Sequence, residues 1–269
     1  MSKSINNYLK KFYYGKNLSK IDLTNEIDKV WDSYNISNYL DYNKIKLFYN
    51  HPVWILNGLF SKNNINSAKH REAISKYICR LKNKKLNIAD FGGGSGYLAS
   101  ILAKNLKDLK SIDIIEPFPS NYFRKKINNN KIFFKKKLKK NYYDIIILQT
   151  VLEHVHNPID IALECINALK IGGLIFFGND FYPIEKCHLK ENFYLRHTFN
   201  FIIRNSSLEY KGRVPDCNYM EIFYKNSKYS SNFLYYKVFL AKYFIGIFLN
   251  YAHSIYVCIK KFIYKIFIE

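Results

Sequence analysis

Four glycines follow a single acid in the run Asp90-Phe-Gly-Gly-Gly-Ser-Gly96. The apolar residues before Asp90 predict a buried strand, and the glycines predict a tight turn into a helix. Such a turn lets the backbone approach a ligand closely, and the new helix offers unpaired N–H groups and a positive dipole end. The run therefore predicts a site for a small, partly anionic ligand.

The spacing of these glycines limits which class of ligand the turn can bind. A dinucleotide fingerprint needs a small residue at position 97, where this chain has Tyr97. The match is instead to the pattern Asp-x-Gly-x-Gly-x-Gly, with Asp90, Gly92, Gly94 and Gly96, and this resembles the first motif of class I S-adenosylmethionine-dependent methyltransferases. The resemblance implies that these four residues bind S-adenosylmethionine.

A second acid stands where the resemblance requires one. Glu116 ends the apolar run Ser111–Glu116, 20 residues after Gly96. A carboxylate at the end of the second strand holds the ribose hydroxyls of a nucleoside cofactor. After the third strand, the acid that often contacts adenine in the family is missing from Phe133–Lys140, so adenine recognition is left to backbone groups or apolar packing.

The third constellation follows the fourth strand, in the run Gln149-Thr-Val-Leu-Glu-His-Val155 and in Asn157-Pro158. With Leu169–Gly173, it resembles the methyltransferase subgroup that contains the ubiquinone and menaquinone biosynthesis enzymes. That resemblance places His154 near the methyl-transfer site. Gln149, at the strand terminus, is expected to contact the cofactor or shape the pocket.

Methyl transfer mainly requires that acceptor and methyl group are aligned and water is excluded. A neutral imidazole can remove a proton from a hydroxyl or a carbon acid, which gives His154 a general-base role. The alternative is that His154 only closes a hydrogen bond within its loop. His156, Asp180 and His197 are weaker candidates near neighbouring strand ends.

The elements that carry these residues alternate between strand and helix. We expect strands at 88–91, 112–115, 131–134, 144–148 and 174–178, with helices at 96–105, 120–128 and 158–170, and an antiparallel hairpin at 208–214 and 219–224. Gly172 and Gly173 are expected to stop the last of these helices. The pattern predicts a Rossmann-like, seven-stranded, mostly parallel α/β sheet with helices on both faces.

Three segments are expected. Residues 1–85 form an N-terminal helical cap, with a helix from the N-cap Ser67 to Arg80, and Tyr49–Trp54 either face a ligand or pack the cap onto the sheet. Residues 86–227 form the methyltransferase domain. Residues 228–269 form an amphipathic helical tail.

The tail combines a wide apolar face with a narrow polar stripe. On a helical wheel the polar residues share an arc of about 140°, and they are Lys242, Gly246, Asn250, His253, Ser254, Lys260, Lys261 and Lys265. This pattern suits a helix lying in a membrane interface, or one packed on the domain or on a second subunit, with a homodimer as the result. A true membrane span ranks third because only 17 residues are uncharged.

Composition limits the function classes. The net charge is +21, but only six of the 42 basic residues are Arg, so nucleic acid ranks as an unlikely partner. Five scattered cysteines and the absence of a signal peptide favour a cytoplasmic chain, peripheral on the inner face of the membrane. No metal site is expected, and Cys187, His188 and Cys217 fit no standard ligand spacing.

The sequence therefore predicts a methyltransferase that uses S-adenosylmethionine on a small-molecule, saccharide or lipid-linked acceptor, through O-methylation. A catalytically silent cofactor-binding scaffold and an RNA methyltransferase remain the alternatives.

Overall fold

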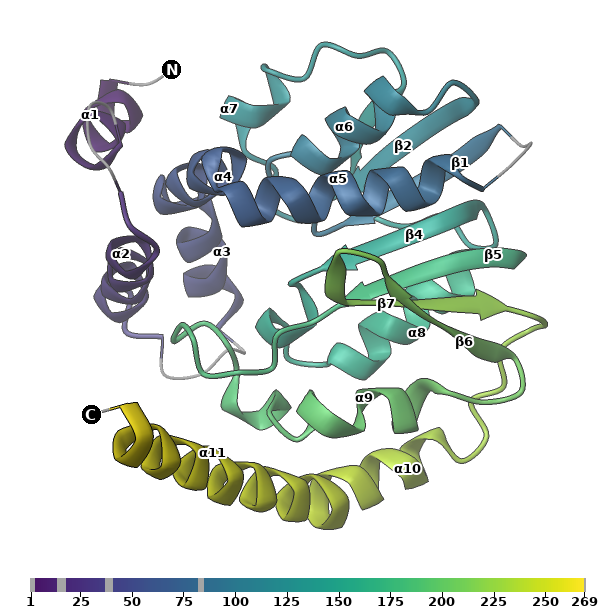
Figure 1. Cartoon of the computed structure of the whole chain (residues 1–269). Helices are drawn as coiled ribbons and strands as arrows, with labels where there is room; N and C mark the ends of the chain where they lie inside the picture. The colour runs from purple at the N-terminus through teal and green to yellow at the C-terminus, as the bar shows by residue number, and fades with distance from the viewer. Residues whose placement is uncertain (1–2, 14–17, 37–40, 82–84, 269) are drawn as a thin grey trace.

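The computed structural model describes residues 3–13, 18–36, 41–81 and 85–268. Its centre is a seven-stranded sheet in the order β3-β2-β1-β4-β5-β7-β6, in which β7 runs antiparallel to both of its neighbours. The predicted α/β sheet is confirmed, including the hairpin at its edge (Figure 1). The strands are β1 (Leu86–Phe91), β2 (Leu109–Ile115), β3 (Ile132–Lys135), β4 (Tyr143–Gln149), β5 (Leu169–Gly178), β6 (Leu208–Val214) and β7 (Cys217–Lys225).

The strand order reverses between β1 and β4, which are parallel neighbours paired through Ala89 and Ile146. The chain leaves β1 toward β2 on one side and leaves β4 toward β5 on the other. In an open α/β sheet, ligands bind outside the carboxyl ends of the strands at such a switch point. The glycine turn after β1 and the loop after β4 therefore meet there.

Helices cover both faces of the sheet. α5 (Ile65–Cys79) and α6 (Tyr97–Asn105) share one apolar cluster with the sheet, whereas α8 (Pro158–Ala168) and α9 (Leu195–Ile203) share the cluster on the opposite face. The central strands are consequently buried on both sides, which explains why β4 reads as a continuous apolar run.

A layer of N-terminal helices lies across the carboxyl ends of the parallel strands (Figure 1). Its own apolar cluster includes Phe48, Leu56 and Trp31, and it reaches the short helix α7 through Phe123. The capping box of Ser19 and Asp22 starts its second helix. The helices are α1 (Lys3–Phe12), α2 (Lys20–Ser33), α3 (Tyr42–Asn50) and α4 (Val53–Asn63), with α7 at Asn121–Arg124.

Three expected helix boundaries are wrong, and one is that of α7, which ends at Arg124 rather than at 128. α8 ends at Ala168, and Gly172 and Gly173 lie inside β5, where the pairing with β4 shifts register. Gly173 serves the pairing with β4 instead of ending the helix. It lets the two strands approach closely, because a Cβ there would lie 2.9 Å from the Asp144 carbonyl oxygen. α5 begins at Ile65 rather than after Ser67. Its N-cap is Asn64, whose side chain accepts the N–H of Ser67.

The tail is one continuous helical segment, formed by α10 (Leu234–Leu240), a π-helical turn and α11 (Gly246–Ile268). Leu234 and Ala241 are buried, a Cβ at Gly246 would lie 2.9 Å from the Tyr194 Cβ, and the Asn250 side-chain amide donates to the Phe193 carbonyl. Part of the predicted polar stripe therefore faces the domain rather than water.

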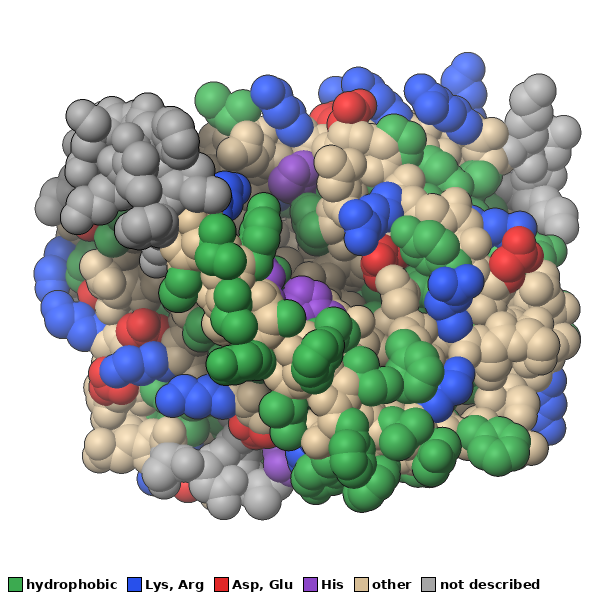
Figure 2. All heavy atoms as spheres, turned by 60° about the horizontal axis from the view of Figure 1, so that its bottom comes forward, with side chains coloured by type: hydrophobic (Ala, Val, Ile, Leu, Met, Phe, Trp, Pro, Cys, Tyr) green, Lys and Arg blue, Asp and Glu red, His purple; other side chains and the backbone are tan. Residues whose placement is uncertain are grey.

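The outer face of the tail is strongly apolar. Nine large hydrophobic side chains between positions 239 and 259, and three just before them, are at least 44% exposed, for example Phe248 at 70% and Tyr251 at 69%. The stretch Leu234–Lys260 is long and apolar enough to cross a membrane, and 11% of its most apolar window is buried. Figure 2 turns this side of the molecule forward and shows hydrophobic side chains spread across it. Most large apolar side chains of the tail thus face away from the domain, whereas Ala241, Gly246 and Asn250 face toward it.

Candidate active site

The glycine turn is shaped by contacts that only glycine allows. Gly92 has φ +69°, and a Cβ there would lie 2.5 Å from a methyl group of Val151 in the loop after β4. Gly96 caps α6 with φ +70°, and a Cβ there would lie 2.3 Å from the Ile127 side chain. Any larger residue would push the turn away from its neighbours, so both the backbone and the packing require glycine.

Asp90 lies under this turn at the end of β1. Its side chain is 2% exposed, and its Oδ2 atom has no hydrogen-bond partner within the described part of the chain. Burial, together with the nearby Glu116 carboxylate, raises the pKa of Asp90 from 3.8 to about 7. A buried carboxylate oxygen without a donor is costly, so this atom is ready to accept a hydrogen bond.

Glu116 closes the second strand and joins it to the glycine turn. Its Oε1 accepts the backbone N–H of Phe118 at 3.1 Å, and its carboxylate also accepts a hydrogen bond from the backbone of Gly94. Burial raises the pKa of Glu116, while these two N–H groups lower it. The structure brings Asp90, Glu116 and Gly94 together, as the sequence predicted. Their part in binding a cofactor stays a prediction.

A row of aromatic rings connects Glu116 to the loop after β4. Phe118 stacks on Tyr49 with ring centroids 5.7 Å apart, and Tyr49 lies 4.9 Å from Trp54. Trp54 in turn meets the ring of His154 edge-on at 6.2 Å. The Trp54 indole Nε1 is buried without a partner among the described residues. The N-terminal layer therefore forms a common wall for both halves of the site.

His154 ends a single 3-10 turn, η1 (Leu152–His154), directly after β4. Its Nδ1 lies 3.3 Å from the Cys187 carbonyl oxygen, so the loop hydrogen bond considered from the sequence is present. Burial, and the charge that His188 would carry, lower the pKa of His154 to about 3. The imidazole is neutral at physiological pH, and it is a weak base.

Two neighbours of His154 were not predicted as site residues. Glu153 is fully buried, its Oε1 accepts the backbone N–H of Asp180, and burial raises its pKa to about 8. His188 lies edge-on to His154 with ring centroids 4.6 Å apart. Glu153 lies within the motif that pointed to His154, whereas His188 lies in the loop after β5 rather than after β4. Sequence spacing therefore could not pair these two residues.

The remaining sequence candidates lie elsewhere. The Gln149 side-chain amide donates to the Tyr219 hydroxyl of β7, so its contact with a cofactor stays a prediction. His156 is exposed beside Glu191, and His197 packs against His253 of the tail. Thr150, between Gln149 and η1, has φ +52°, which is a strained conformation for a β-branched residue.

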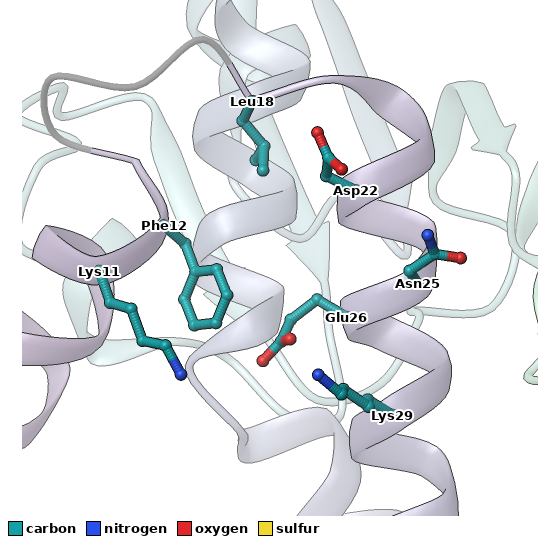
Figure 3. A pocket seen from close by; sticks show the side chains of 7 residues that line it. All are labelled: Lys11, Phe12, Leu18, Asp22, Asn25, Glu26 and Lys29. Atoms are coloured by element: carbon teal, nitrogen blue, oxygen red, sulfur yellow. The ribbon is translucent and has the colours of Figure 1, made fainter.

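One cavity in the described part of the chain lies away from this site. It has a volume of about 410 Å³ and lies between α1 and α2, on the N-terminal layer (Figure 3). Its lining residues are Lys11, Phe12, Leu18, Asp22, Asn25, Glu26 and Lys29. None of them belongs to the glycine turn or to the loops after β4 and β5.

The comparison with known families decides the assignment. The sequence profile of a family described as a methyltransferase domain matches residues 67–208, which is more than half of the chain. The chain belongs to this methyltransferase family. The matched segment runs from α5 to the start of β6 and contains the glycine turn, Glu116 and His154.

Solved methyltransferase structures are similar to this chain at low sequence identity. A S-adenosylmethionine-dependent methyltransferase from Methanococcus maripaludis is 16% identical over 67% of this chain and 95% of its own, with a TM-score of 0.48. The plantazolicin methyltransferase BpumL, solved with S-adenosylhomocysteine, is 14% identical over 76% of this chain and 100% of its own, with a TM-score of 0.46. A Haloferax volcanii methyltransferase solved with its activator Trm112 is 15% identical over 46% of this chain and 57% of its own, with a TM-score of 0.38. The chain therefore spans little more than half the length of some of the structures that it matches.

Membership of this family implies S-adenosylmethionine as the cofactor, and the residues of this methyltransferase fit it. The glycine turn leaves room for a close ligand, because a Cβ at Gly94 would have no neighbour within 3.4 Å. The unpartnered Asp90 oxygen would lie 2.5 Å from a Cβ at Gly93, and the Glu116 carboxylate accepts a hydrogen bond from the Gly94 backbone. Hydroxyl and ammonium donors are the groups that such acceptors bind.

Proposed function

We propose that this methyltransferase O-methylates a small-molecule, saccharide or lipid-linked acceptor at a membrane surface, with S-adenosylmethionine as the donor. The observation that carries the proposal is the aromatic wall, because it joins the Glu116 side of the site to His154. In this proposal residues 86–227 are the catalytic domain, residues 1–85 cover it, and residues 228–269 attach it to the membrane.

The cofactor half holds the donor, which supplies an electrophilic methyl group when bound. In this proposal Glu116 accepts hydrogen bonds from the ribose hydroxyls, and Asp90, Gly92, Gly94 and Gly96 enclose the rest of the nucleoside and the amino-acid end. Gln149 completes the pocket at the end of β4. The support is the hydrogen bond between the Gly94 backbone and Glu116, which places the acid against the turn.

The acceptor half lies where β4 and β5 end. In this proposal His154 accepts the proton of the acceptor hydroxyl, and Trp54 packs against the acceptor and excludes water. The motif around His154 resembles that of the ubiquinone and menaquinone biosynthesis subgroup, which supports a hydroxyl-bearing acceptor. The lowered pKa of His154 keeps the imidazole neutral and available, although it also limits its strength as a base.

The tail supports a membrane location. Its aromatic side chains point away from the domain, while Gly246 and Asn250 face it, and this is the opposite of a helix in water. Contacts with α9 run along α10 and α11, so the helix lies flat on the domain rather than projecting from it. A flat apolar face with the exposed Lys242 and Lys260 suits the surface of an anionic bilayer.

The tail also lies beside the acceptor loop. His253 of α11 contacts the ring of Tyr182 at 6.1 Å, and the Tyr182 carbonyl accepts a hydrogen bond from His188. An acceptor that arrives along the membrane would therefore reach the loop after β5 first. This arrangement favours a lipid-linked acceptor over a freely diffusing one.

Calorimetry with S-adenosylmethionine and S-adenosylhomocysteine tests the cofactor assignment. We expect micromolar or tighter binding of at least one of them. The absence of binding to both would contradict the enzyme assignment. Binding without methyl transfer to any hydroxyl acceptor in a lipid extract would favour a silent scaffold.

A further inference from the structure

Glu153, His154 and His188 form a cluster that the sequence did not predict. One ligand atom from each residue lies within 4.8 Å of the ligand atoms of the other two. Glu153 and His154 are neighbours in η1, whereas His188 comes from the loop after β5. Two imidazoles and one carboxylate are the donor set of catalytic zinc sites, in which three protein ligands leave one position open.

Both imidazoles are held in the tautomer that a metal needs. His154 Nδ1 lies 3.3 Å from the Cys187 carbonyl oxygen, and His188 Nδ1 lies 2.7 Å from the Tyr182 carbonyl oxygen. Because a carbonyl oxygen only accepts, each Nδ1 carries the proton, and each Nε2 keeps its lone pair. Metal-binding histidines are oriented by this kind of hydrogen bond.

Glu153 supplies the second, independent observation. The residue is 0% exposed, and its Oε1 accepts the backbone N–H of Asp180 at 3.2 Å. Its Oε2 is buried and has no hydrogen-bond partner in the described part of the chain. Buried carboxylate oxygens are almost always paired, so an unpaired one requires an explanation. A cation within the cluster would provide it.

The backbone ties the two ligand segments together. The N–H of Leu189 donates to the Glu153 carbonyl at 2.9 Å, and the Asn192 side chain donates to the Leu152 and Val155 carbonyls. The loop after β5 is further tied to α2, because the Lys186 backbone N–H donates to Asp28. His188 is therefore held in place against η1, as a preformed site requires.

We infer that Glu153, His154 and His188 bind one divalent transition metal of the zinc class, with an open coordination position beside Trp54. A soft or borderline ion fits two nitrogen ligands better than magnesium or calcium, which prefer all-oxygen sites. Metal binding itself is independent of the proposed function. One further role rests on that function: with the metal bound, His154 would hold the ion instead of taking the proton, and a hydroxyl group at the open position would release its proton to water more readily.

Zinc titration of the full chain tests this inference. The chain is stripped with a chelator, dialysed, and titrated with Zn²⁺ in competition with a chromophoric chelator. We expect one Zn²⁺ per chain, and Co²⁺ in its place should give the intense visible absorption of a four-coordinate site. Mg²⁺ should not compete. Zinc bound at well under one equivalent, or Mg²⁺ bound equally well, would overturn the inference.

Three variants locate the site. His188→Asn and His154→Asn keep an amide that can donate to the same carbonyls but remove Nε2, and Glu153→Gln keeps the shape of the carboxylate without its charge. Each should weaken Zn²⁺ binding roughly a hundredfold, because loss of a ligand exceeds the effect of an outer hydrogen bond. The matched control is His156→Asn, an exposed histidine two residues from His154, which should bind Zn²⁺ as the wild type does.

Folding and cofactor binding keep the outcomes separate. Thermal unfolding and S-adenosylhomocysteine calorimetry are measured on every variant. If a histidine variant unfolds, the Zn²⁺ affinity of Glu153→Gln, which preserves the side-chain volume, still tests the site. If the metal-free wild type binds S-adenosylhomocysteine but no Zn²⁺, the metal inference fails and the proposed function stands. If Zn²⁺ binds but neither cofactor form does, the proposed function fails and the metal inference stands.

Discussion

The two halves of the site are built in different ways. The proposed cofactor half consists of the turn after β1 and the end of β2, and it offers the backbone groups of Gly92 to Gly96 and the Glu116 carboxylate. The acceptor half consists of side chains from η1, the loop after β5, α4 and the tail. The first half is local in sequence, and the second is assembled from distant segments.

This difference predicts how readily each half can change the ligand that it binds. A backbone cradle is insensitive to side-chain changes, provided that the glycines remain. A pocket of side chains on loops changes its ligand with few substitutions. In the proposed function, the cofactor half is therefore recognisable at the level of a family, while the acceptor half would carry the specificity. Four predictions test this contrast, in order of expected size.

The first prediction concerns the stability of the cofactor half without its ligand. Folded Asp90 keeps its proton to about pH 7, whereas the unfolded carboxyl loses it near 3.8, so stability falls as pH rises through this window. Asp90→Asn removes this dependence, and by pH 8 it should gain roughly 4 kcal/mol in unfolding free energy relative to its difference at pH 4. Urea unfolding at several pH values measures this, with the exposed Asp108→Asn as control. Parallel pH curves for wild type and Asp90→Asn would contradict it.

The second prediction concerns the acceptor half. His154→Ala should lower the methyl-transfer rate by roughly a hundredfold or more and leave cofactor affinity nearly unchanged. Because His154 belongs to the acceptor half, the rate of methyl transfer should change and the cofactor affinity should not. Single-turnover rates and calorimetry on the same preparations measure it, with His156→Ala as the control. An unchanged rate would return His154 to a structural role.

The third prediction concerns the cofactor half again. Glu116→Ala should weaken S-adenosylmethionine binding by about 1.5 to 3 kcal/mol, because ribose donors lose a charged acceptor. The acceptor half should not respond, so zinc binding should stay the same. Calorimetry measures both, and Glu116→Gln should recover part of the affinity. Equal affinity in Glu116→Ala would show that the ribose lies elsewhere.

The fourth prediction concerns the tail, which borders only the acceptor half. Lys242→Gln and Lys260→Gln should each weaken binding to anionic liposomes by about 1 kcal/mol, and high salt should do the same to the wild type. Phe244→Ser with Phe248→Ser and Tyr251→Ser should abolish co-sedimentation, whereas Ile65→Ser, also exposed, should not. Ultracentrifugation without lipid completes the test. A stable dimer that ignores liposomes would identify the face as a subunit interface.

Much of the cofactor half was predictable. Strand, glycine turn, helix, strand and acid follow one another within Leu86–Glu116, so the spacing alone brings Asp90, the glycines and Glu116 together. The fold class followed from the same alternation of apolar strands and helices. Helix boundaries were less predictable, because β4 pairing at Gly173 and the cap at Asn64 outweighed the local signals.

The amino-acid sequence by itself determined the sheet, the methyltransferase family and the residues of the glycine turn, because these depend on short-range patterns of apolar, glycine and acidic residues. The tertiary structure decided the rest. It placed Glu153 and His154 against His188, which lies 34 residues after His154, and it turned part of the polar stripe of the tail, with Asn250, inward onto the segment that leads into α9. Neither contact has a local signal, because each depends on how segments from different strands and helices pack together.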